Sequence, residues 1–152
     1  MRNLLTLLGL LLLVAAEPAR ASRLLIPMDD GQANHLKAYG IAYWVLDQSV
    51  EVEWLLNYRG GSFLLPAAPS ISSECTIRGV SFEVIADVQA SRILSEMASP
   101  EVNQQRVKLE VPPKVAVYSP VGKLPWDDAV TLVLTYAEIP YEVVYDAEVI
   151  GG

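Results

Sequence analysis

Two adjacent carboxylates and a histidine form the first group of side chains in this chain that could bind a metal or a ligand. Asp29, Asp30 and His35 stand close together in the stretch DDGQANH. They match no closed zinc pattern, and the stretch is also typical of a turn leading from a strand into a capped helix. We therefore assign no metal here. We expect Asp29 and Asp30 to contact a ligand, because parallel α/β sheets bind ligands beyond the carboxyl ends of their strands.

A second candidate site is the stretch NYRGGSF, in which Arg59 precedes Gly60 and Gly61. A guanidinium beside exposed backbone N–H groups could hold a carboxylate or a phosphate. The alternative is a Gly-Gly turn next to a solvated arginine. Lys123 lies in a third loop at the same predicted edge, without the spacing of a phosphate-binding loop around it. The predicted ligand is an unidentified small molecule, and no cofactor is assigned.

Catalytic machinery is not recognisable in the sequence. His35 is the single histidine and Cys75 the single cysteine, and neither Gly-x-Ser-x-Gly nor Gly-x-Cys-x-Gly occurs. We interpret His35 as a capping or surface residue. Cys75 is interpreted as a small, partly buried residue, and it can form no intramolecular disulfide. We therefore assign no catalytic residue.

Residues 1–21 have the layout of a secretory signal peptide. Arg2 precedes an apolar run from Leu4 to Ala16, and the small-residue pattern Ala-Arg-Ala ends at Ala21. The run is shorter than the about 20 residues that a membrane-spanning helix needs. We expect cleavage after Ala21, which would release a periplasmic or extracellular protein from the membrane. A retained anchor is the alternative.

The charge of the chain excludes one class of partner. The formal net charge is −7, and loss of the leader makes the mature chain more acidic still. Proteins that bind nucleic acid do so through clusters of lysine and arginine. Nucleic acid is therefore not an expected partner.

Apolar periodicity divides the rest of the chain into three strand-helix-strand sets. The predicted strands and helices, in chain order, are 23–29, 32–48 (helix) and 50–58; 76–85, 87–99 (helix) and 106–111; and 114–120, 125–139 (helix) and 141–150. In the second helix, a stripe made of Ala90, Ile93, Leu94 and Met97 is expected to face the core. Short connections between strands and helices favour parallel crossovers. We therefore expect an α/β fold with a largely parallel sheet.

The last set, from Lys114 to Gly152, is expected to depend on another part of the protein. At roughly 40 residues, it can hardly bury enough surface alone. It either packs on residues 22–111 or opens a larger, truncated domain. The inward stripe of its helix is predicted to be Trp126, Val130, Val133, Leu134 and Ala137. Its final apolar strand could also pair with a second copy of the chain.

The runs LLNYRGGSF and PWDDAVTLVLTYAEIPY, within the segments 24–66 and 114–150, resemble a family of exported bacterial proteins labelled asparagine synthetase B. The resemblance implies a class I glutamine amidotransferase-like, flavodoxin-like domain that continues well beyond this chain. Residues 114–152 would be its first β-α-β unit, and residues 22–111 an N-terminal α/β region. The chemistry in the label is not visible, because Arg2 stands where glutamine-dependent synthetases carry a catalytic cysteine.

We predict an exported α/β protein that forms the N-terminal part of an amidotransferase-like protein and holds no complete catalytic site. One alternative is a complete module that binds a small ligand or a carbohydrate. A second alternative is an autonomous glutaminase or glutamine-hydrolysing asparagine synthase, which the missing nucleophile turn disfavours.

Overall fold

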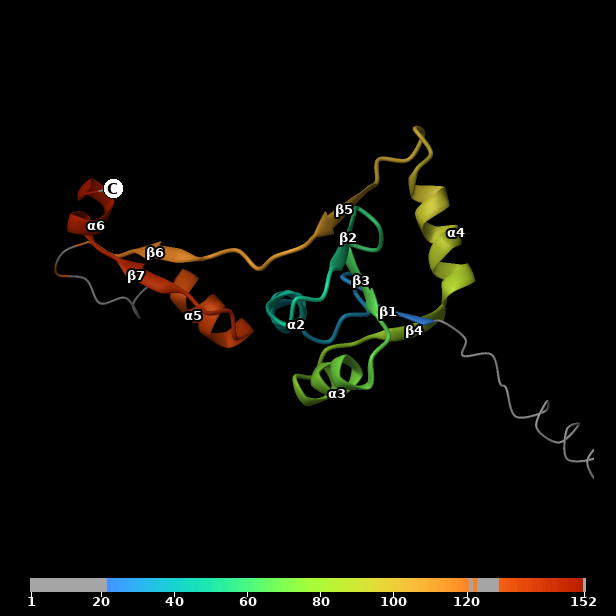
Figure 1. The fold of residues 1–152 in the computed structure, drawn as a ribbon, viewed down its shortest axis with the longest axis horizontal. Coiled ribbons are helices and arrows are strands. Elements are labelled where there is room, and N and C mark those ends of the chain that lie inside the picture. Colours follow the sequence, from blue (N-terminus) through green and yellow to red (C-terminus); the bar gives the residue numbers. More distant parts are fainter. Residues whose placement is uncertain (1–21, 121, 123–128, 152) are drawn as a thin grey trace, which may run out of the picture.

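A five-stranded sheet organises the larger part of the protein in this computed structural model, which describes residues 22–120, 122 and 129–151 (Figure 1). Its strands are β1 (Ser22–Ile26), β2 (Val52–Leu56), β3 (Ser62–Pro66), β4 (Glu83–Ala86) and β5 (Gln105–Leu109). They lie in the order β4-β1-β3-β2-β5, and every neighbouring pair is antiparallel. We call residues 22–109 the sheet unit.

Two interlocked β-α-β segments explain the order of the strands. Helix α2 (His35–Asp47) connects β1 to β2, and helix α3 (Pro69–Ile77) connects β3 to β4. Strand β3 lies between β1 and β2, and strand β1 lies between β3 and β4. The strands that a helix connects are therefore parallel to each other, but an antiparallel strand separates them. This is the split β-α-β arrangement of ferredoxin-like folds.

The predicted parallel sheet is therefore wrong for residues 22–109, and so is a flavodoxin-like arrangement of these strands, although the α/β class holds. The error arises in the Gly-, Pro- and Ser-rich segment 59–75, for which the sequence predicted neither a strand nor a helix. It contains β3 and most of α3. The predicted strand 76–85 also begins too early, because Thr76 and Ile77 belong to α3 and β4 starts at Glu83.

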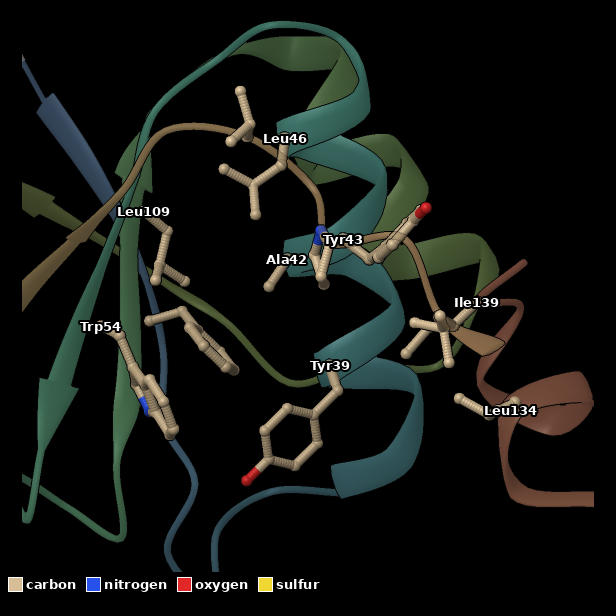
Figure 2. Close-up of a pocket in the computed structure, with 12 residues that line it drawn as sticks. Tyr39, Ala42, Tyr43, Leu46, Trp54, Leu109, Leu134 and Ile139 are labelled. Carbon is tan, nitrogen blue, oxygen red and sulfur yellow. The ribbon is translucent and has the colours of Figure 1, made fainter. Parts of the chain in front are cut away.

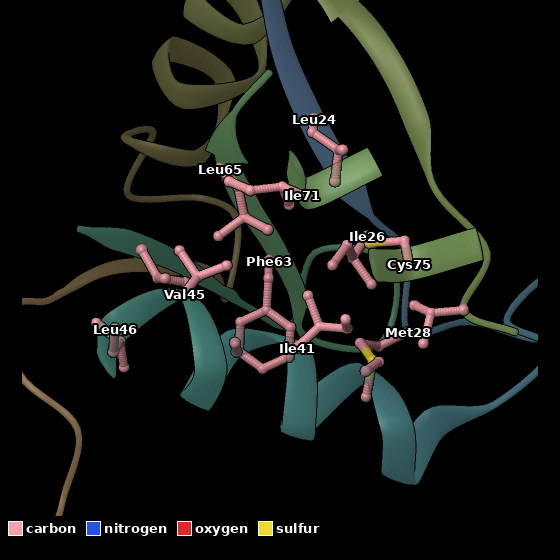
Figure 3. Packing of buried hydrophobic residues seen from close by; sticks show 14 residues of the cluster. Leu24, Ile26, Met28, Ile41, Val45, Leu46, Phe63, Leu65, Ile71 and Cys75 are labelled. Carbon is pink, nitrogen blue, oxygen red and sulfur yellow. The ribbon is translucent and has the colours of Figure 1, made fainter. Parts of the chain in front are cut away.

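Both faces of the sheet are covered, as the alternation along its central strands shows. Leu24 and Ile26 of β1 and Phe63 of β3 pack against α2 and α3 (Figure 3). Leu25, between Leu24 and Ile26, and Leu64, directly after Phe63, point to the other face. Continuous apolar runs arise because successive side chains enter two different cores.

Helix α4 (Asp87–Met97) covers the second face of the sheet. Ala90, Ile93 and Met97 are buried there, and Leu94 packs against the same cluster, which confirms the predicted stripe. Helix α2 also matches its prediction. Its N-cap Asn34 accepts a hydrogen bond from the backbone N of Lys37 at 3.1 Å. Among the described residues, no helix is long and apolar enough to cross a membrane.

The remaining elements form a small second layer that we call the C-terminal unit (residues 116–151). It contains β6 (Ala116–Tyr118), α5 (Ala129–Ala137), β7 (Glu142–Val144) and α6 (Asp146–Gly151). Strands β6 and β7 pair in parallel, with Val117 opposite Val143. Here the strand-helix-strand pattern does give a parallel pair. Helix α2 lies between this unit and the sheet (Figure 1).

The final strand is much shorter than predicted. Strand β7 ends at Val144, and helix α6 replaces the expected extended residues. The carboxylate of Glu148 accepts a hydrogen bond from the backbone N of Tyr145 at 2.9 Å, and Asp146 adds negative charge to the first turn. Both features stabilise a helix start and compete with extension of the strand.

The predicted inward stripe of α5 is correct in part. Ala137 is buried and Leu134 is half-buried, but Val130 and Val133 are exposed. Trp126 lies outside the described residues. Valine side chains of the C-terminal unit are therefore exposed to solvent, whereas valines of the sheet unit, such as Val52, are buried.

Candidate functional site

Two of the residues predicted to bind a ligand, Asp29 and Arg59, do meet, but they pair with each other, and Glu83 joins them. Arg59 Nε donates to Asp29 Oδ2 at 2.7 Å, and Arg59 Nη1 donates to Glu83 Oε1 at 2.7 Å. These contacts raise the pKa of the Arg59 guanidinium and lower the pKa of the Asp29 carboxyl. An anionic ligand at Arg59 would therefore have to displace two carboxylates.

The glycines of the same loop serve a close backbone contact. The backbone N of Met28 donates to the carbonyl of Arg59 at 3.0 Å. Gly60 has a φ of +80°, and a Cβ added to it would lie 2.2 Å from the carbonyl oxygen of Met28. The backbone N of Gly61 donates to the carbonyl of Tyr58 at 3.0 Å. The loop is thus fixed against the end of β1.

A buried glutamine closes the adjacent turn after β1. Gln32 Nε2 donates to the carbonyls of Pro27 and Ser81 at 2.7 and 3.1 Å. Its Oε1 accepts from the backbone N of Ser81 at 2.8 Å and from that of Asn34 at 3.2 Å. The side chain thereby joins the β1–α2 turn to the segment that precedes β4, a role that the sequence pattern did not indicate.

The other predicted residues do not join this cluster. Asp30 is exposed on the turn, and Lys123 lies outside the described residues. His35 is also exposed, and its Nε2 lies 3.2 Å from the carbonyl oxygen of Met28. Among the described residues, no group of three or more histidine, cysteine, aspartate and glutamate side chains is arranged to hold a metal.

Cys75 is buried in α3 under the sheet. Burial raises the pKa of its thiol to about 11. A thiol with such a pKa stays protonated at neutral pH, where a nucleophilic cysteine needs to be a thiolate. The side chain therefore serves packing.

The two units come into close backbone contact at Gly40 of α2 and the end of α5. A Cβ on Gly40 would lie 1.8 Å from the carbonyl oxygen of Ala137, so no larger residue fits without moving a backbone. Ala137 is itself buried. Gly40 is therefore a contact residue, and its place in the middle of an otherwise apolar helix is the sequence signal for that contact.

An ion-pair cluster surrounds this contact. The carboxylate of Glu138 accepts a hydrogen bond from Lys37 Nζ, and its second oxygen lies 3.2 Å from Arg78 Nη1. Lys37 holds the pKa of Glu138 below its usual value, with a further contribution from the charge of Arg78. Asn34 Nδ2 also donates to the Tyr136 hydroxyl at 2.7 Å.

Glu138 has an unusual backbone for its residue type. Its φ is +61°, in the left-handed region where helix ends prefer glycine. The backbone N of Glu138 donates to the carbonyl of Thr135, and that of Ile139 to the carbonyl of Leu134, which is the Schellman pattern. Its carboxylate contacts Lys37 of α2 and Arg78 directly after α3, which a glycine at this position could not do.

An apolar pocket of about 300 Å³ opens beside this interface. Figure 2 shows Trp54 and Leu109 on the sheet side, Leu134 and Ile139 on the α5 side, and α2 between them. The residues around the pocket are all uncharged: Tyr39, Ala42, Tyr43, Leu46, Trp54, Phe63, Leu109, Val111, Pro113, Val115, Leu134 and Ile139. None of them belongs to the predicted ligand site.

Three aromatic rings shape one wall of the pocket. Trp54 and Phe63 stack with their centroids 6.1 Å apart, and Tyr39 meets Phe63 edge-on at 5.5 Å. Trp54 Nε1 donates to the carbonyl of Gly61 at 2.9 Å, which fixes the indole. The spacing of Tyr39, Ala42, Tyr43 and Leu46 on one helix face is the sequence signal that could have indicated this wall.

No protein-family model matches this chain, and neither does any curated protein or solved structure with which it was compared.

Proposed function

We propose that this chain is the N-terminal, non-catalytic part of an exported amidotransferase-like protein. In this proposal, the sheet unit acts as a platform that positions the C-terminal unit as the first β-α-β segment of a parallel, flavodoxin-like sheet. The observation that carries the proposal is the parallel β6–β7 pair, whose connecting helix is fixed on one side and exposed on the other.

A parallel pair of short strands is an unusual element to leave uncovered. Parallel sheets occur almost always with helices on both faces, because their β-α-β connections place helices there. Strands β6 and β7 each have three residues, and two-stranded sheets are marginal in water. These facts support a larger parallel sheet as the natural context of the unit.

The exposed apolar side chains support the same context. Leu132 is 61% exposed, Val130 52% and Ile150 85%. Together with Tyr118 and Val149, they extend over β6, α5 and α6. Exposed apolar surface on this scale is typical of proteins that bind another protein layer.

The proposal that the chain is exported depends on the leader, and the proposal that it is non-catalytic depends on its side chains. The leader has the order of basic, apolar and small residues found in signal peptides. The high pKa of the Cys75 thiol and the pairing of Arg59 with two carboxylates argue against chemistry at either position.

The test is to compare the chain with the product of the whole coding frame. We expect the frame to continue past Gly152, and the longer protein to protect the amides of β6 and β7 from hydrogen exchange. A stop codon directly after Gly152 would contradict the proposal.

A second measurement tests the absence of catalysis. The purified chain is expected to release no ammonia from glutamine or asparagine. Ammonia release that Cys75→Ala abolishes would show that the chain is itself an enzyme, against this proposal. Ile77→Ala is the control variant, because Ile77 lies on the same helix but is 76% exposed.

A further inference from the structure

The pocket between α2, the sheet and α5 has the features of a small-molecule site. Its volume of about 300 Å³ is at the lower end of the range for ligand pockets, roughly 300 to 1,000 Å³. Its walls come from three parts of the chain: α2, the sheet with the segment that follows β5, and α5. It is separate from the Asp29–Arg59–Glu83 cluster and from the exposed face of the C-terminal unit.

The chemistry of the walls selects the charge of a ligand. Every residue around the pocket is uncharged, and the ion pairs of Lys37, Arg78 and Glu138 lie outside this group. A charged group that left water for this pocket would gain no partner and would lose its hydration. An uncharged ligand avoids that cost.

The aromatic wall selects the shape of a ligand. Trp54 and Phe63 stack, and Tyr39 stands edge-on to Phe63. Aromatic rings prefer offset stacking or edge-to-face contact. Phe63 is buried at 2% exposure, so a flat ring in the pocket would make such contacts with Tyr39 and Trp54. Long flexible chains would lose more rotational freedom on binding than a rigid ring system.

The volume sets the size of a ligand. An engineered apolar cavity of about 150 Å³ in another protein binds one benzene ring. A pocket of about 300 Å³ therefore has room for about two rings. We propose that this pocket binds an uncharged small molecule with a flat apolar ring system of about this size. The inference is independent of the amidotransferase-like assembly proposed above.

The experiment uses the uncharged dye N-phenyl-1-naphthylamine and the purified chain. We expect a saturable rise in dye fluorescence at one site per chain. The anionic dye 8-anilinonaphthalene-1-sulfonate should bind at least about tenfold more weakly, because the pocket offers no cation for the sulfonate.

Two variants test whether the dye occupies this pocket. Val111→Asp adds a carboxylate at the rim and Ala42→Phe fills the interior, and each should weaken binding by at least about tenfold. Val111 is 76% exposed, so Val111→Asp should leave the fold intact. It therefore still tests the proposal if Ala42→Phe prevents folding. The matched control is Val88→Asp, because Val88 is 78% exposed on α4.

A further control addresses the exposed face of α5. Leu132→Asp should leave dye binding unchanged, because Leu132 is exposed outside the pocket. Unchanged binding in Val111→Asp, or equal loss in Leu132→Asp, would overturn the proposal. Dye binding that falls as the protein dimerises at high concentration would also overturn it, because a second copy of the chain would then be the occupant.

Discussion

Leucine side chains show how differently the two units bury apolar surface. In the sheet unit, Leu24, Leu64 and Leu65 are 0% exposed, whereas Leu132 in the C-terminal unit is 61% exposed. The sheet has helices on both faces, but β6 and β7 contact mainly each other, and β7 also contacts α6. Burial of apolar surface is the dominant favourable contribution to folding. We therefore expect the sheet unit to provide most of the stability and the C-terminal unit to depend on its attachment.

That attachment is narrow and specific. It consists of the close contact between Gly40 and Ala137, the contacts of Glu138 with Lys37 and Arg78, and the hydrogen bond from Asn34 to Tyr136. Backbone contact at a glycine allows little variation in position. The comparison suggests that the sheet unit fixes the orientation of the C-terminal unit without enclosing it.

A matched pair of leucine substitutions should give the largest difference between the units. Leu64→Ala removes a fully buried side chain and should lower the free energy of unfolding by about 2 to 5 kcal/mol. Leu132→Ala removes an exposed side chain and should change it by no more than about 0.5 kcal/mol. Urea denaturation followed by circular dichroism measures both. Equal losses would show that the C-terminal unit is as well packed as the sheet.

Substitution at the contact between the units should detach one from the other without unfolding the sheet. In Gly40→Ala, the new Cβ would lie 1.8 Å from the carbonyl of Ala137, so α5 must move. Tryptic cleavage after exposed Lys114 should become about tenfold faster, which corresponds to about 1.4 kcal/mol of lost docking. Helix α2 itself should gain about 1 kcal/mol, because alanine favours a helix more than glycine does.

Alkylation of Cys75 provides the control for that variant. The thiol is buried in the sheet unit and its pKa is raised to about 11, so iodoacetamide should react slowly at pH 8 in both proteins. Faster alkylation in Gly40→Ala would mean that the sheet core had opened. The sheet unit would then not stay folded when the C-terminal unit detaches.

The smallest expected effect is that of the charge on Glu138. Because Lys37 lowers the pKa of Glu138 below the ordinary value of 4.5, the ion pair stabilises the folded state above that pH. This stability is lost as the pH falls through the lowered pKa. Glu138 is half exposed, so solvent screening limits the contribution to about 0 to 1 kcal/mol.

Glu138→Gln is the variant that tests this contribution. It keeps the left-handed backbone position and removes the charge, so the acid-induced loosening of the C-terminal unit should largely disappear. Hydrogen exchange of the Glu142 amide between pH 3 and 6, corrected for the intrinsic exchange rate at each pH, measures this. Lys108→Met is a matched control, because Lys108 pairs with Glu51 and Glu110 on the sheet unit. An unchanged pH dependence in Glu138→Gln would exclude this carboxylate as the cause.

The sequence predicts helices better than it predicts the sheet, for a physical reason. Helices α2 and α4 carry their own signals, since Asn34 caps one and a regular apolar stripe marks the other. The position of β3 between β1 and β2 depends on contacts between distant residues, which local periodicity does not contain. Proline and serine in the same segment further obscured α3.

The candidate sites show the same division. The sequence indicated Asp29 and Arg59 as single residues but not Glu83, and only the fold shows that Arg59 pairs with both carboxylates. The apolar pocket needs α2, the sheet and α5 together. Its residues taken singly have the composition of an ordinary core, so the sequence could not distinguish a cavity from packing.

Hydrogen exchange of the purified chain tests most directly whether the C-terminal unit is a weakly supported layer. Two amides report on β6 and β7: Ser119, which donates to the carbonyl of Val144, and Glu142, which donates to the carbonyl of Val115. We predict that they exchange at least about a hundredfold faster than the strand amides of β3, without global unfolding. Equal protection of both units, lost together in one transition, would contradict the account.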